Sequence, residues 1–238
     1  MLQLLPNALT LAALCAGLTA IRLAFGGQFD KAAALILLAA LLDGLDGRLA
    51  RRLRSESAMG AELDSLCDFV NFGVAPALVL HLWAFDGAAG AGWIAALVYA
   101  VACVLRLARF NIGSRDQLAA GLPKKAFTGV PSPAGAMLVF LPIFVANLNP
   151  ALTVPGPVCA LWMILVAALM VSRLPTPALP QTSIRREQAG LILLAVVGLG
   201  AALLTYPWLT LVLLNLGYLL LLALGWKQRW RQSTRKDG

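Results

Sequence analysis

The chain has 238 residues, of which 60% are hydrophobic and only 13% are charged, and its mean hydropathy is +0.82. A water-soluble domain is only about half apolar, so this composition excludes an ordinary soluble globular protein. Apolar runs of about 18 to 22 residues recur along the chain, and each is long enough to cross a bilayer as a helix. The sequence therefore predicts a polytopic membrane protein.

The apolar runs predict an all-α membrane bundle of about eight transmembrane helices. Their expected bounds are 5–25, 31–51, 62–85, 91–112, 132–148, 153–171, 189–206 and 208–226. This organisation gives a single transmembrane domain over residues 1–226, followed by a basic tail over residues 227–238.

The net charge of +8 fits either a nucleic acid or an anionic membrane surface as a partner. The positions of the Lys and Arg residues along the chain favour the membrane. With the N-terminus in the cytoplasm, all of the 19 Lys and Arg residues except Arg22 and Lys31 fall on the cytoplasmic side. We therefore expect both termini in the cytoplasm, membrane lipids as neighbours and no nucleic-acid partner. A bacterial inner membrane, with the active site facing the cytoplasm, is the expected location.

Four carboxylates interrupt the second and third predicted helices. Asp43 and Asp46 are three residues apart, and Asp64 and Asp68 are four apart, so each pair shares one face of its helix. Because the two helices run antiparallel around a short connection, Asp43 should face Asp68, and Asp46 should face Asp64. Ionised carboxylates within a membrane are costly and usually mark a functional site.

Four converging negative charges repel one another strongly unless cations neutralise them, and two divalent ions match a charge of −4. Carboxylate oxygens favour hard cations, so the residues predict two Mg²⁺ or Mn²⁺ ions. Arg51, at the end of the second helix, either neutralises a phosphate or simply orients the helix in the membrane.

The stretch Asp43-Gly-Leu-Asp-Gly-Arg-Leu-Ala-Arg51, followed by Gly60, Asp64 and Asp68, resembles the signature of the CDP-alcohol phosphatidyltransferase family. Three further segments resemble the branch of that family that uses serine as the acceptor alcohol: residues 64–77, residues 106–111 and residues 127–134. Position 71 is Asn71, where a serine is typical of this branch. The resemblance implies transfer of the phosphatidyl group of CDP-diacylglycerol to the hydroxyl of L-serine, with release of CMP, by a homodimer.

The resemblance also implies roles for individual residues. Asp43, Asp46 and Asp64 would hold the metals, Asp68 would bind one metal and act as general base, and Gly47, Ala50 and Gly60 would admit the cytidine nucleotide.

Other polar side chains are candidates from the sequence itself. Arg106 and Arg109 could bind the serine carboxylate or a phosphate, or only anchor the fourth helix. Four weaker pocket candidates are as well explained as helix caps or interhelical hydrogen bonds: Asn7, Thr10, Asn71 and Thr128.

Two other functions are compatible with the sequence. Within the same family, the acceptor could be glycerol 3-phosphate or an inositol phosphate, which would require more cationic groups in the pocket. Intramembrane carboxylates also build cation transporters, but these place their acids near the bilayer midplane, whereas Asp46 and Asp64 are expected near the cytoplasmic edge.

Overall fold

The structure is a computed structural model that describes residues 5–53, 55, 57–85, 90–119, 129–149, 151–172 and 186–234; within these, only the backbone is described for residues 114–119, 186–189 and 227–234. The described part of the chain is helical and contains no strand. Its elements are α1 (Leu5–Phe25), α2 (Phe29–Leu53), α3 (Ala58–Asp68), the π-helical segment η2 (Phe69–Val74), α4 (Ala75–Ala84), α5 (Gly90–Ala119), α6 (Ser132–Val139), α7 (Leu141–Leu148), α8 (Gly156–Val171), α9 (Arg186–Thr205) and α10 (Pro207–Thr234).

Each of the eight predicted spans corresponds to one helix or to consecutive helical segments, which confirms the polytopic helical bundle. Four helical stretches are long and apolar enough by themselves to cross a membrane: Leu5–Phe25, Ala58–Ala84, Gly90–Gly113 and Pro207–Trp226. Three shorter apolar stretches cover Ser132–Leu148, Gly156–Val171 and Gly190–Thr205. The 25-residue helix α2 is long enough to cross as well, but charged side chains at both of its ends lower its hydropathy.

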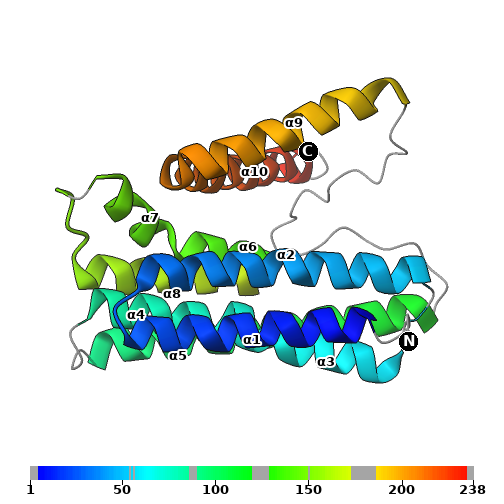
Figure 1. The fold of residues 1–238 in the computed structure, drawn as a ribbon, viewed down its shortest axis with the longest axis horizontal. Coiled ribbons are helices and arrows are strands. Elements are labelled where there is room, and N and C mark those ends of the chain that lie inside the picture. The colour runs from blue at the N-terminus through cyan, green and yellow to red at the C-terminus, as the bar shows by residue number, and fades with distance from the viewer. Residues whose placement is uncertain are drawn as a thin grey trace.

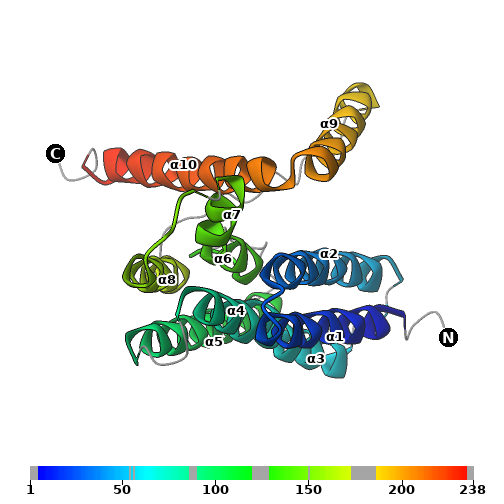
Figure 2. The ribbon, with the colours of Figure 1, turned by 60° about the vertical axis from the view of Figure 1, so that its left-hand side comes forward.

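The helices form two unequal layers. α1 to α5 and α8 form the main bundle, and α9 and α10 lie on one side of it, connected through α6 and α7 (Figures 1 and 2). α1 packs most extensively against α2, α5 against α8, and α10 against α7. The buried face of α1 carries small residues every three or four positions: Ala13, Gly17, Ala20 and Ala24. Such a stripe lets two helices approach closely in a membrane.

A proline explains the π-helical segment in the third span. Pro76 has no N–H to donate to the carbonyl of Phe72, four residues earlier. The Tyr99 hydroxyl, from α5, donates a hydrogen bond of 2.8 Å to that carbonyl instead. Short π-helical segments are frequent at functional sites, and this one begins immediately after Asp68.

The fifth predicted span is divided by the same mechanism. Pro142 has no N–H for the carbonyl of Leu138, and the helix breaks at Phe140 into α6 and α7. The Trp162 indole, from α8, donates a hydrogen bond of 2.8 Å to the Leu138 carbonyl. In both spans, a neighbouring helix supplies the donor that proline removes.

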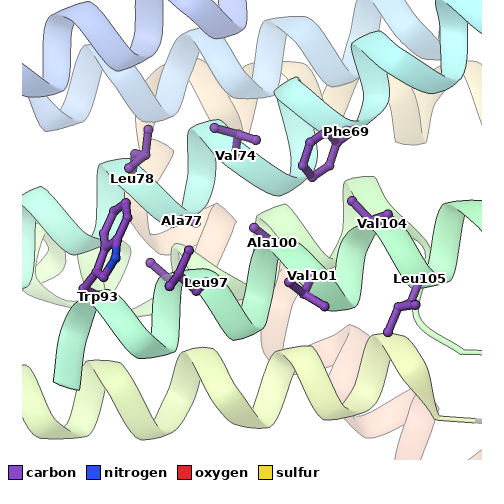
Figure 3. A pocket seen from close by; sticks show the side chains of 11 residues that line it. Phe69, Val74, Ala77, Leu78, Trp93, Leu97, Ala100, Val101, Val104 and Leu105 are labelled. Carbon is purple, nitrogen blue, oxygen red and sulfur yellow. The ribbon is translucent and has the colours of Figure 1, made fainter. Parts of the chain in front are cut away.

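A groove of about 440 Å³ lies between the η2–α4 stretch and α5. Its lining is entirely hydrophobic and includes Phe69, Leu78, Trp93 and Leu105 (Figure 3). Because no charged or hydrogen-bonding ligand would find a partner there, the polar chemistry of the protein lies elsewhere.

Candidate metal and active site

Carboxylates from two antiparallel helices converge beside α1. Asp43 of α2 and Asp64 and Asp68 of α3 each offer an oxygen, and these three oxygens lie within 4.8 Å of one another. The carboxyl groups of Asp43 and Asp68 are in direct contact. The structure therefore brings together the facing pair that the mirrored sequence positions predict.

Asp46 lies next to this cluster but has a different environment. Its side chain is 3% exposed, and its Oδ2 accepts a hydrogen bond of 2.6 Å from the Thr10 hydroxyl of α1. Asp64 interacts electrostatically with Asp43 and Asp46, and Arg51 partly offsets this repulsion. Thr10 thus makes an interhelical hydrogen bond, one of the three roles that the sequence allowed, and the bond fixes one carboxylate oxygen of Asp46.

The donor set fits divalent metal ions. All four side chains offer only carboxylate oxygens, which are the ligands that Mg²⁺ and Mn²⁺ prefer. Asp68 Oδ1 is buried and has no hydrogen-bond partner within the described residues. A buried oxygen without a partner is costly unless a cation or a hydrogen-bond donor reaches it. The arrangement is therefore electrostatically incomplete without cations.

A narrow space beside the acids is kept open by glycine. A Cβ atom at Gly60 would lie 3.1 Å from both Asn7 Oδ1 and Ser57 Oγ. Ser57 caps the start of α3 by accepting a 3.0 Å hydrogen bond from the Gly60 N–H. Asn7 therefore lines the same space as Gly60.

The remaining nucleotide candidates lie one turn further along α2. Gly47 and Ala50 are half-buried, and Arg51 is exposed. A Cβ atom at Gly47 would lie 3.6 Å from Arg51 Nη1, so this guanidinium lies over the glycine. The two residues thus provide a cationic group next to an open surface.

The two arginines of α5 differ sharply in environment. Arg106 is only 9% exposed and donates a 2.9 Å hydrogen bond to the Ser132 hydroxyl at the start of α6. It also interacts electrostatically with Asp68. Arg109 is exposed, and it donates a 2.8 Å hydrogen bond to the Val171 carbonyl at the end of α8. Arg106 therefore faces the acidic cluster, and Arg109 links two helix ends.

Asn71 lies against α1. Asn71 is buried in η2 and lies so close to Gly17 of α1 that any side chain at Gly17 would collide with it. Its Oδ1 has no hydrogen-bond partner among the described residues. Thr128 lies outside the described residues.

Some residues that support the site were missed from the sequence. Ser132 binds Arg106, and Asn111 of α5 donates a 2.9 Å hydrogen bond to Ser65 of α3, between the two acids of that helix. Ser132 and Asn111 lie in the segments that carry the family resemblance, so the resemblance could have identified both as candidate site residues. Ser65 had no signal beyond its position next to Asp64.

The fold and the site define a class: a helical membrane protein in which two neighbouring helices present a cluster of three carboxylates, with a fourth beside it, next to a glycine-lined space. Residues 3–174 match the CDP-alcohol phosphatidyltransferase family, and the chain belongs to that family.

Its similar proteins include CDP-diacylglycerol–serine O-phosphatidyltransferases from three bacteria. The Mycobacterium tuberculosis protein is 38% identical over 231 residues, which cover 96% of this chain and 80% of that protein. The Mycobacterium leprae protein is 40% identical over 219 residues, which cover 92% of this chain and 73% of that protein. The Bacillus subtilis protein is 34% identical over 187 residues, which cover 78% of this chain and 97% of that protein.

Proposed function

We propose that the protein transfers the phosphatidyl group of CDP-diacylglycerol to the hydroxyl of L-serine, forming phosphatidylserine and releasing CMP. The observation that carries this proposal is the convergence of Asp43, Asp64 and Asp68 on one point, with carboxylate oxygens within 4.8 Å. Family membership and the names of the similar proteins support the choice of substrates.

The metal ligands in this proposal are Asp43, Asp46, Asp64 and Asp68. Two divalent cations held by them, Mg²⁺ or Mn²⁺, would neutralise the diphosphate and stabilise the charge that develops as the phosphoryl group moves. Thr10 positions Asp46 by its 2.6 Å hydrogen bond, which holds the carboxylate of this ligand in place.

Asp68 acts as the general base. A serine hydroxyl is a poor nucleophile at neutral pH, so a carboxylate must accept its proton as it attacks. The hydroxyl oxygen forms a bond to the lipid-side phosphorus, the diphosphate P–O bond breaks, and CMP leaves with the electron pair. The unpartnered Asp68 Oδ1 is the atom that receives the proton.

The substrates occupy opposite sides of this base. Gly47, Ala50 and Gly60 leave room for the cytidine nucleotide, Asn7 contacts it beside Gly60, and Arg51 binds a phosphate. On the α5 side, Arg106 faces Asp68 and attracts the serine carboxylate. Arg109, Asn71 and Thr128 remain weaker candidates for the acceptor pocket.

The apolar helices and the family make this an integral membrane protein. We further propose that it lies in a bacterial cytoplasmic membrane, with both termini and the active site on the cytoplasmic side. Arg48, Arg51 and Arg52 support this orientation, because they lie on α2 at the same end as the acidic cluster. A homodimer, implied by the family resemblance, is also proposed, and cross-linking in native membranes tests it.

The purified protein should be given CDP-diacylglycerol with L-serine, glycerol 3-phosphate or an inositol phosphate, and the lipid product identified by mass spectrometry. We expect phosphatidylserine and CMP in equal amounts, with serine only. Asp68→Asn should abolish turnover while largely retaining nucleotide binding, whereas Asp43→Asn should weaken metal-dependent nucleotide binding as well. Consumption of glycerol 3-phosphate alone would overturn the assignment of serine.

A further inference from the structure

The last helix presents two polar residues to the bundle. Leu211, Asn215, Tyr218 and Leu222 of α10 are spaced by four, three and four residues, so they form one face of the helix. Leu211, Asn215 and Leu222 are buried, and the partly buried Tyr218 packs against the hydrophobic core. Polar side chains on the buried face of a membrane helix are expensive and often functional.

Both of these polar side chains have a buried atom without a hydrogen-bond partner in the described part of the chain: Asn215 Oδ1 and the Tyr218 hydroxyl. Asn215 donates a 2.8 Å hydrogen bond to the Leu211 carbonyl of its own helix, which holds its side chain along α10. The Tyr218 hydroxyl has no such internal bond. It lies close enough to the Arg106 guanidinium of α5 for the two groups to interact electrostatically.

Arg106 has an unusual set of partners for a buried cation. Its contacts are the neutral Ser132 hydroxyl, at 2.9 Å, and the Phe110 ring, whose centroid lies 5.5 Å from the guanidinium carbon. It interacts with Asp68 electrostatically, and the described residues show no direct ion pair between them. A buried guanidinium of this kind has unused donors for an anion.

We propose that Tyr218 binds the carboxylate of the acceptor amino acid together with Arg106, and so helps the enzyme to select serine. This inference rests on the proposed function. In serine, only three carbon atoms separate the hydroxyl oxygen from the carboxylate oxygens. A serine whose hydroxyl contacts Asp68 therefore places its carboxylate near Arg106, where the buried Tyr218 hydroxyl provides the second donor.

Tyr218 lies on a helix that the family match does not include. The family match covers residues 3–174, so α10 lies outside it. α10 crosses the bundle on the side of α6 and α7, and α6 begins with Ser132, the partner of Arg106 (Figure 2). The acceptor pocket would thus be completed by a helix beyond the matched region.

The test is Tyr218→Phe, with Tyr206→Phe as the matched control, because Tyr206 is 65% exposed and lies immediately before the same helix. Loss of one hydrogen bond to a carboxylate should raise KM for serine about tenfold and leave KM for CDP-diacylglycerol unchanged. The preference for serine over ethanolamine, which lacks the carboxylate, should fall by a similar factor. Tyr206→Phe should change neither quantity.

A stability measurement separates this role from a structural one. Because the Tyr218 hydroxyl has no partner in the described structure, Tyr218→Phe should melt at or above the wild-type temperature without serine, but should lose the stabilisation that added serine gives. An unchanged KM for serine, a raised KM for CDP-diacylglycerol, or a variant that melts earlier without serine would each overturn the inference. If the wild-type protein makes no phosphatidylserine, the proposed function itself fails.

Discussion

Tyr99→Phe is the sharpest structural perturbation. The Tyr99 hydroxyl and the Phe72 carbonyl that it binds belong to residues that are both fully buried, so water cannot replace the lost bond. An orphaned buried group costs about 1–3 kcal/mol, whereas hydrogen bonds between membrane helices average ~0.6 kcal/mol with a maximum of ~1.7. Because Pro76 removes the ordinary backbone donor, we expect a loss near the upper membrane value, about 1.5 kcal/mol of unfolding free energy.

The assay is an SDS titration of the protein in mixed micelles, followed by circular dichroism, for a double-mutant cycle with Pro76→Ala. Alanine restores an N–H that can donate to the Phe72 carbonyl, so in this background Tyr99→Phe should cost less than ~0.5 kcal/mol. Tyr206→Phe, which removes an exposed hydroxyl, is the control and should have little effect in either background. An equal cost of Tyr99→Phe in both backgrounds would refute the explanation of the π-helical segment.

Three further predictions concern the site. Gly60→Ala should raise KM for CDP-diacylglycerol several-fold with little change in kcat, because the new methyl group lies 3.1 Å from Asn7 Oδ1. If Gly60 serves only folding, steady-state kinetics should instead show an unchanged KM and a lower kcat. Thr10→Val should lower activity and cost about 1–3 kcal/mol of stability by removing the side-chain donor of Asp46, and a fully active variant would show that Thr10 does not position this carboxylate. Removing divalent ions with EDTA should abolish phosphatidylserine formation, and Mg²⁺ or Mn²⁺ should restore it; undiminished activity in the chelator would contradict the metal assignment.

The sequence predicted the helical spans and the acidic pairing well, because both depend on local periodicity. Spacings of three and four residues place side chains on one helical face whatever the surroundings, so the contact of Asp43 with Asp68 followed from a single antiparallel turn. The hydrophobic runs likewise predicted most helix bounds within a few residues, but α5 continues to Ala119 and α10 to Thr234, seven and eight residues beyond the predicted ends.

The details that depend on other helices could not be predicted in the same way. Spans 62–85 and 132–148 were predicted as unbroken although they contain Pro76 and Pro142, and the donors that compensate for these prolines, Tyr99 and Trp162, come from other helices. The same holds for the electrostatic interaction of Tyr218 with Arg106, across more than one hundred residues of sequence. Such contacts depend on how the helices pack, which periodicity does not encode.

Mn²⁺ binding to the purified protein, followed by electron paramagnetic resonance in the presence of CDP-diacylglycerol, tests the central assignment most directly. The wild-type protein should bind two Mn²⁺ ions per chain, as should Asp30→Asn, which alters an acid of α2 that accepts a hydrogen bond from Asn147. Asp43→Asn and Asp64→Asn should each bind fewer ions or bind them much more weakly. Unchanged Mn²⁺ binding in both of these variants would contradict a shared metal site between α2 and α3.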